Sequence, residues 1–352
     1  MEEKKKTARE IIEGYDGPPV RIMEVCGTHT HEIFRLGIRK LLPEQVELIS
    51  GPGCPVCVTQ VGFIDEAIYL ALERQVTICT FGDLVRVPGT NMSLAGAREK
   101  GAKIRIVYSP VDAKEYAKEH PKEQVTFLSV GFETTTPSAC LSVKKAREEG
   151  LTNYSILTAN KTMPQAYEAL KGSADIFLYP GHVNAITGTK LCEELAKEGV
   201  SGVVAGFTAK ELLTALAVAL VRFQEGGPFF VNCYPRVVTE NGSPQAQKLV
   251  EEMMEPCDSE WRGLGVIKGS GMRLQEEWSA FDARKKYKIP LIQGKANPAC
   301  RCGDVLQGKC KPSDCKVFGK VCTPQHPVGA CMVSGEGACS AYYMYGEAEK
   351  MK

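Results

Sequence analysis

Short apolar segments that alternate with helical ones are the feature that most constrains the fold of this 352-residue chain. Each apolar segment is followed by Gly, Pro or Ser, which is typical of buried parallel strands. The alternation therefore predicts an α/β fold with parallel sheets. The expected strands are residues 20–25, 46–49, 76–80, 104–107, 125–130, 154–157, 176–179 and 203–205.

The eight expected strands divide into four and four, with similar spacings in both halves. We therefore expect two similar parallel-sheet βα domains of the Rossmann-like kind, at residues 20–124 and 125–228. A single eight-stranded barrel is the alternative arrangement. Beyond residue 228 the pattern changes, and residues 229–352 are expected to form an irregular cysteine-rich iron–sulfur domain. An N-terminal helix within residues 1–19 packs either on that domain or on the first one.

Charge and hydrophobicity exclude several classes of function. The chain has 43 basic and 42 acidic residues, so no electrostatic argument favours a nucleic-acid or membrane-surface partner. Its longest apolar run, residues 212–221, is about half the length that a membrane span needs. The N-terminus lacks the apolar segment of a secretory signal. We expect a cytoplasmic protein.

The cysteine content indicates metal or thiol chemistry. There are 15 cysteines, and cytosolic thiols are kept reduced, so a disulfide framework explains them poorly. The region 293–340 has little apolar material and needs a covalent or metal link to be ordered. It lacks the Cys-x2-Cys pairs of zinc ribbons, and its irregular spacing fits an iron–sulfur cluster better. Spacing alone does not select the ligands among Cys300, Cys302, Cys310, Cys315, Cys322, Cys331 and Cys339.

The first motif, Cys26-Gly-Thr-His29, directly follows the strand 20–25 and begins a helix. A helix N-terminus favours the thiolate form of a cysteine. His29 can increase the thiolate fraction or relay protons, and Cys-x-x-His also suits a soft metal ion. The alternative is a buried cysteine with histidines that cap the helix.

The second motif, Gly51-Pro-Gly-Cys54-Pro-Val-Cys57, follows the strand 46–49. A Cys-x-x-Cys pair at the start of a helix is typical of redox-active thiols. Half of a zinc site is the alternative, and Cys26 with His29 would then supply the other half.

Two further motifs also follow expected strands. Gly131-Phe-Glu133-Thr-Thr-Thr-Pro137 can bind an anion at the helix start, and Glu133 can orient a ligand or move a proton. The alternative is capping of the helix by threonine. Tyr179-Pro-Gly-His182 places a histidine at another strand end, where ligands bind in α/β sheets. A purely structural histidine is the alternative there.

Together, the four motifs and the tail spacing resemble the HypD family of hydrogenase maturation proteins, in the same order over residues 20–340. The resemblance implies a scaffold that carries the iron of the [NiFe]-hydrogenase active site while it acquires two cyanides and one carbon monoxide. It implies a HypC-type chaperone as partner. It also implies HypE as the source of cyanide, with HypF upstream.

The resemblance also implies roles for individual residues. Cys26 would bind that iron, His29 would assist near it, and the thiol pair Cys54 and Cys57 would lie close by. Glu133 and His182 are further candidates for catalysis. A [4Fe-4S] cluster would be held by Cys300, Cys315, Cys322 and Cys339, and an accessory redox pair would be formed by Cys302 and Cys331.

The sequence thus favours a redox-active assembly scaffold over a stand-alone turnover enzyme. The rival hypothesis is an iron–sulfur protein disulfide reductase, and a structural zinc protein is a third. The motif at Cys26 discriminates between the first two, because a plain reductase has no need of a further soft ligand at a strand end.

Overall fold

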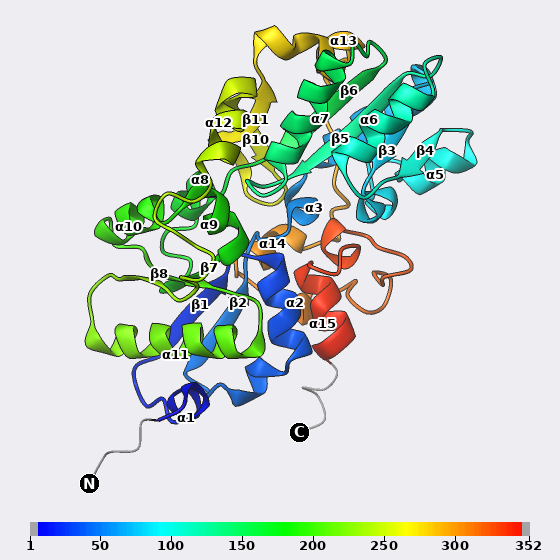
Figure 1. Cartoon of the computed structure of the whole chain (residues 1–352). Coiled ribbons are helices and arrows are strands. Elements are labelled where there is room, and N and C mark those ends of the chain that lie inside the picture. Colours follow the sequence, from blue (N-terminus) through cyan, green and yellow to red (C-terminus); the bar gives the residue numbers. More distant parts are fainter. Residues whose placement is uncertain (1–5, 347–352) are drawn as a thin grey trace.

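Two open parallel sheets form the frame of the structure, a computed structural model that describes residues 6–346 (Figure 1). The first sheet has the strand order β2-β1-β7-β8-β9, and the second has the order β4-β3-β5-β6. The first sheet comprises β1 (Val20–Glu24), β2 (Val46–Ser50), β7 (Ile176–Pro180), β8 (Ser201–Ala205) and β9 (Phe230–Asn232). The second comprises β3 (Thr77–Thr80), β4 (Ile104–Ile106), β5 (Val125–Gly131) and β6 (Tyr154–Asn160).

The expected α/β fold with parallel sheets is confirmed, but the grouping of strands in chain order is wrong. β7 pairs with β1, with Ile22 opposite Ile176, and β5 pairs with β3, with Thr77 opposite Val125. The chain leaves the first sheet after β2, builds the second sheet and returns at β7. Two separate sheets also exclude the eight-stranded barrel. Spacing along the chain does not reveal strand neighbours, because parallel strands are joined by crossovers whose paths depend on packing.

Helices cover the sheets and explain the buried strands. Every residue of β5 is buried, as in a strand covered on both faces. The N-terminal helix α1 (Ala8–Glu13) packs on α11 (Ala209–Glu225), beside the first sheet. The other helices are α2 (Gly27–Arg35), α3 (Pro55–Val58), α4 (Val61–Glu73), α5 (Leu94–Glu99), α6 (Pro110–Glu119), α7 (Thr136–Glu148), α8 (Met163–Ala169), α9 (Gly181–Thr187), α10 (Lys190–Lys197), α12 (Pro244–Met253) and α13 (Ala283–Lys286).

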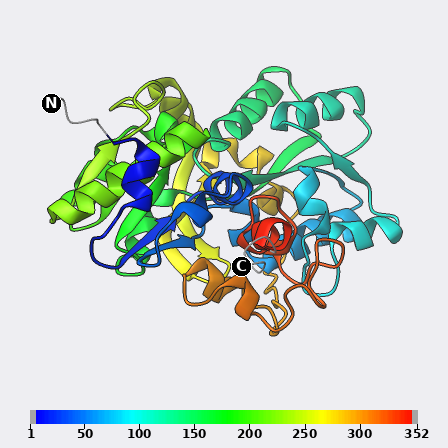
Figure 2. The same ribbon diagram turned by 90° about the horizontal axis from the view of Figure 1, so that it is seen from below.

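An antiparallel hairpin and an irregular tail complete the chain. The hairpin is β10 (Met254–Trp261) with β11 (Gly265–Leu274), and it contacts β6 of the second sheet. The tail lies between the regions of the two sheets when the molecule is seen from below (Figure 2). Its helices are α14 (Cys302–Leu306), η4 (Pro312–Asp314), η5 (Ala330–Met332) and α15 (Ala338–Tyr345), and further short 3-10 helices are η1 (Ile38–Leu41), η2 (Gly82–Arg86) and η3 (Glu276–Phe281).

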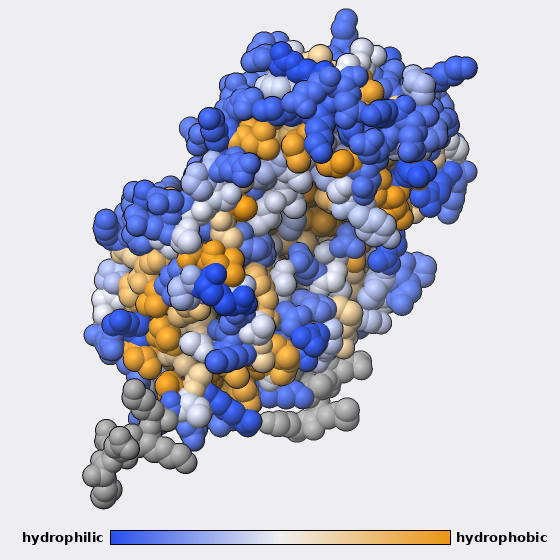
Figure 3. Space-filling model, viewed as in Figure 1, coloured by the Kyte–Doolittle hydropathy of each residue, from blue (hydrophilic) through white to orange (hydrophobic). Residues whose placement is uncertain are grey.

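The surface is mainly hydrophilic in the view of Figure 3, with apolar residues around the packed pair α1 and α11 at the lower left. A shallow groove there is lined by Ile11, Val218 and Val221 among others. Within residues 6–346, no helix combines the length and apolar character that crossing a bilayer requires.

Candidate functional site

The first two cysteine motifs meet where β1 and β2 end. Cys26 is the N-cap residue of α2, and Cys54 is that of α3. The two loops touch, since the Gly27 N–H donates to the Gly53 carbonyl at 3.0 Å. A Cβ atom at residue 53 would lie 2.1 Å from the Cys26 nitrogen, so this close approach requires glycine. Parallel pairing of β1 with β2 therefore brings both cysteines to one sheet edge.

Cys26 is a buried thiol. Its residue is 1% exposed, and burial raises the pKa of the thiol to about 12, although the backbone N–H groups of His29 and Thr28 partly oppose this shift. The cost of removing a charged sulfur from water is therefore larger than the stabilisation that the few N–H groups at the helix N-terminus give to a thiolate.

The side chains of His29 and His182 both pack against the ring of Phe207. Their rings contact Phe207, with centroid distances of 4.8 and 5.1 Å. The Nε2 of His29 lies 3.1 Å from the Gly206 carbonyl and donates to it, while its buried Nδ1 has no partner among the described residues. Burial lowers the pKa of His29 to about 3 and that of His182 to about 4. Both imidazoles are thus neutral at pH 7, and Nδ1 of His29 is a free acceptor.

Glu133 is a buried carboxyl group with one unused oxygen. Its Oε1 accepts the Met163 N–H at 2.8 Å, and Oε2 has no partner in the described part of the chain. Burial raises the pKa of Glu133 to about 7. Burial also raises the pKa of the nearby Tyr167 hydroxyl, and Glu133 and Cys26 add to that shift. Glu133, Tyr167 and Cys26 therefore share one buried polar region.

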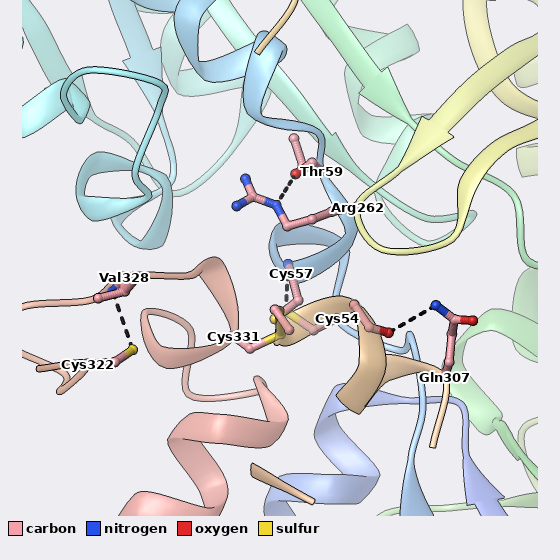
Figure 4. Close-up of a disulfide and its surroundings, with 10 residues drawn as sticks. Cys54, Cys57, Thr59, Arg262, Gln307, Cys322, Val328 and Cys331 are labelled. Carbon is pink, nitrogen blue, oxygen red and sulfur yellow. Dashed lines mark hydrogen bonds between the residues drawn. A yellow bond between two sulfur atoms is a disulfide. The ribbon is translucent and has the colours of Figure 1, made fainter. Parts of the chain in front are cut away.

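The Cys54/Cys57 pair lies against a disulfide between Cys302 and Cys331 (Figure 4). Both members of the pair are free and buried, and the Cys57 N–H donates to the Cys54 sulfur at 3.3 Å. Burial raises the pKa of Cys57 well above its usual value, and Cys54 is the next cause. α3, which carries the pair, contacts η5, which carries Cys331. The fold thus packs a dithiol and a disulfide into one cluster.

Four of the remaining tail cysteines, all except Cys310, line one small cavity. Burial raises the pKa of Cys300, and the thiols of Cys322 and Cys315 add to this shift. The same cavity wall includes the disulfide described above. No group of three or more His, Cys, Asp or Glu side chains within residues 6–346 is arranged to hold a single metal ion. The cysteines that line the cavity are Cys300, Cys302, Cys315, Cys322, Cys331 and Cys339.

Two charged residues at the site were not expected from the sequence. Glu336 accepts the Thr28 hydroxyl at 2.7 Å, and its charge adds to the raised pKa of Cys26. Arg262, at the tip of the hairpin, donates to the Thr59 carbonyl beside the Cys54/Cys57 pair. In the sequence, Glu336 stands three residues before Cys339, and Arg262 belongs to a Trp-Arg-Gly sequence at the end of a strand. Neither pattern indicates a functional residue unless the fold is known.

Comparisons with known proteins agree with the motif analysis. The HypD family model, described as "Hydrogenase formation hypA family", matches residues 2–346. The "Hydrogenase maturation factor HypD" of Cupriavidus necator is 42% identical over 347 residues, which cover 95% of this chain and 92% of that protein. The proteins of the same name from Rhodobacter capsulatus and Escherichia coli are 44% and 43% identical, and each alignment covers 94% of this chain and 90% of the relative.

Proposed function

This chain belongs to the HypD family of hydrogenase maturation factors, and we propose that it is the scaffold on which the Fe(CN)2CO group of [NiFe]-hydrogenase is assembled. A HypC-type chaperone shares the iron, and HypE, with HypF upstream, supplies the cyanide. The observation that carries this proposal is that the Cys54/Cys57 dithiol packs in one cluster with the tail cysteines Cys302 and Cys331, while the loop of Cys26 touches the loop of Cys54. A chain built only to bind a structural metal needs four ligands and no adjacent dithiol.

Cys26 is the proposed protein ligand of the iron cargo. A soft thiolate suits a low-spin iron that carries cyanide and carbon monoxide. Because burial keeps this thiol protonated at pH 7, iron binding must displace its proton. The carboxyl of Glu133, whose pKa is raised to about 7 and whose Oε2 is unpartnered, is the group suited to hold or pass that proton. His29 stays neutral at pH 7, so its Nδ1 offers a hydrogen-bond acceptor rather than a base.

The donor set of the tail cavity is of the kind that holds a thiolate-ligated cluster. Four thiols that are not in the disulfide surround it, and an all-cysteine donor set is the usual one for [4Fe-4S] clusters. We propose Cys300, Cys315, Cys322 and Cys339 as its ligands. A bound cluster supplies electrons singly, whereas a dithiol passes them in pairs. We propose that the adjacent Cys302/Cys331 pair joins these two kinds of transfer.

The two cysteine pairs can exchange electrons directly. The Cys54 thiolate attacks one sulfur of the Cys302–Cys331 bond, that bond breaks, and the departing sulfur takes up a proton. Cys57, deprotonated in turn, attacks the mixed disulfide at Cys54. A Cys54–Cys57 disulfide forms, and the second tail sulfur is released and protonated. Two electrons and two protons have then moved from one pair to the other, and the reverse sequence reduces Cys54–Cys57.

Infrared spectroscopy of the anaerobically purified protein, co-produced with its maturation partners, tests the scaffold role. We expect cyanide and carbonyl stretching bands that are absent in Cys26→Ala. Cys54→Ala should block cyanide loading but keep the visible spectrum of the cluster. Cys140→Ala is the matched control, because Cys140 lies on α7 and is buried in a separate hydrophobic core that contains none of the site cysteines. Bands that persist in Cys26→Ala would contradict the assignment.

A stand-alone iron–sulfur disulfide reductase is the second candidate. The packing of a free dithiol against a disulfide favours it. A cluster signal without cyanide or carbonyl bands, in the presence of functional partners, would support this candidate instead.

A further inference from the structure

The loop between β8 and α11, residues 206–208, lies against both histidines of the site. The ring centroid of Phe207 is 4.8 Å from that of His29 and 5.1 Å from that of His182. The carbonyl of Gly206 accepts the Nε2–H of His29 at 3.1 Å. Because the two histidines belong to α2 and α9, which are far apart in the sequence, this loop is the element that sets their positions relative to each other.

The hydrogen bond to Gly206 fixes which nitrogen of His29 carries the proton. A carbonyl oxygen can only accept a hydrogen bond, so Nε2 donates and Nδ1 keeps its lone pair. Nδ1 is buried and has no hydrogen-bond partner within residues 6–346. The Gly206 carbonyl therefore makes the free nitrogen of His29 an acceptor rather than a donor.

One carboxylate, that of Glu211 in the first turn of α11, anchors this loop. Its Oε2 accepts the Phe207 N–H at 3.0 Å and the Thr208 N–H at 3.1 Å. A Cβ atom at residue 206 would lie 2.3 Å from the same oxygen, so the close approach of the carboxylate to the loop requires glycine there. The backbone of the loop is thus bonded to Glu211 on one side and to His29 on the other.

Glu211 is held in turn by an arginine from a later segment of the chain. Arg236 donates to Oε1 of Glu211 through Nε at 3.0 Å and through Nη2 at 2.7 Å. The Tyr234 ring lies 4.8 Å from the Arg236 guanidinium and meets the Phe207 ring edge-on, with centroids 6.3 Å apart. The Glu211 side chain is 17% exposed and does not belong to the buried face of α11. Its contacts therefore serve the loop and not a hydrophobic core.

We propose that Glu211 is the positioning residue of the histidine pair. By anchoring residues 206–208, its carboxylate holds the Phe207 ring between the two imidazoles and keeps Nδ1 of His29 as an acceptor. Within residues 6–346, all hydrogen bonds of the Glu211 side chain go to the loop and to Arg236, so it acts on the histidines through the loop. The use of this acceptor in loading the iron rests on the proposed scaffold function, whereas the anchoring does not.

Solvent exchange of one imidazole proton tests the anchoring on the full chain. Protein with isotope-labelled histidine and tryptophan is followed by NMR at pH 7, and the Nε2 proton of His29 is identified by its absence in His29→Gln. Glu211→Ala should speed the exchange of this proton about tenfold, the effect of losing one hydrogen bond of ordinary strength. The indole proton of Trp261, which is bonded to Ser270 at 2.7 Å, should keep its exchange rate.

Two variants separate this positioning from ordinary helix capping. Thr208→Ala removes the hydroxyl that accepts the Glu211 N–H at 3.3 Å but leaves the carboxylate bonded to the loop, so the His29 proton should exchange at the wild-type rate. Glu211→Gln keeps an acceptor oxygen and should restore most of the protection.

Three outcomes of the exchange experiment would overturn the role of Glu211. The first is equal acceleration of the His29 proton in Glu211→Ala and Thr208→Ala, which would indicate a capping effect. The second is acceleration of the Trp261 proton together with that of His29, which would indicate a general loss of stability. The third is the absence of a protected Nε2 proton on His29 in the wild type, which needs no variant to fold.

Infrared spectra of protein co-produced with its maturation partners test the use of this acceptor in loading. Glu211→Ala should lower the intensity of the cyanide and carbonyl bands several-fold, whereas Thr208→Ala and Glu211→Gln should not. Bands of wild-type intensity in Glu211→Ala, with accelerated exchange at His29, would overturn the use in loading. Absence of the bands in the wild type would contradict the scaffold function itself, and the exchange experiment would still decide the anchoring.

Discussion

Replacing Arg39 with methionine should show how strongly the sheet edge that carries Cys26 depends on one buried ion pair. Glu24, two residues before Cys26, is completely buried and ion-paired with Arg39, whose side chain is 11% exposed. The same carboxylate accepts hydrogen bonds from Thr30 at 2.7 Å and Ser50 at 3.1 Å. Arg39→Met leaves these bonds but removes the counter-charge.

The size of the effect follows from burial. Removing one partner of a buried pair leaves an uncompensated charge and costs about 3–5 kcal/mol of the free energy of unfolding. Arg39 also donates to the Leu48 carbonyl at 2.8 Å and lies 4.4 Å from the ring centroid of Phe34, and both contacts are lost. We therefore expect a loss at the upper end of this range.

Chemical denaturation at pH 7, followed by circular dichroism, measures this loss. Arg35→Met is the matched control, because Arg35 pairs with Glu32 on the surface and its side chain is 51% exposed. Exposed pairs contribute less than about 1 kcal/mol. Adding Glu24→Gln to Arg39→Met should recover about 2 kcal/mol, since an amide is cheaper to bury than a charge. Equal losses for Arg39→Met and Arg35→Met would refute the reasoning.

Three further outcomes are expected from equilibrium unfolding. Burial raises the pKa of Glu133 from 4.5 to about 7, so the contribution of this group to the free energy of unfolding is fully present below pH 4.5 and is lost as the pH rises. By neutral pH, the free energy of unfolding of the wild type should therefore fall by about 3 kcal/mol relative to that of Glu133→Gln. Parallel curves of stability against pH for the two proteins would contradict this. Trp261→Ala should cost about 3–5 kcal/mol, because this fully buried ring also donates to Ser270 at 2.7 Å. Thr208→Ala removes the capping box of α11 and should cost about 1 kcal/mol, whereas Thr214→Ala, exposed on the same helix, should be nearly neutral.

The residues of the candidate site could be predicted from the sequence because their motifs follow strands. Cys26, Cys54, Glu133 and His182 each come directly after an apolar segment, and parallel sheets present such positions at one edge. The sequence did not reveal that β7 pairs with β1, which is why His182 was not expected to share Phe207 with His29. Strand neighbours depend on crossovers, and no local pattern records them.

The sequence alone determined the local elements, the cysteine-rich tail and the chemical types at each strand end, because periodicity, turn residues and side-chain chemistry act over a few neighbouring positions. Tertiary structure decided three things that such patterns omit. It assigned the strands to two interleaved sheets, it buried Cys26 so that its thiol stays protonated, and it packed the hairpin tip at Arg262 and Gly263 against two cysteine-bearing helices. Strand pairing, desolvation and charge proximity all depend on residues distant in sequence, so only the folded chain defines them.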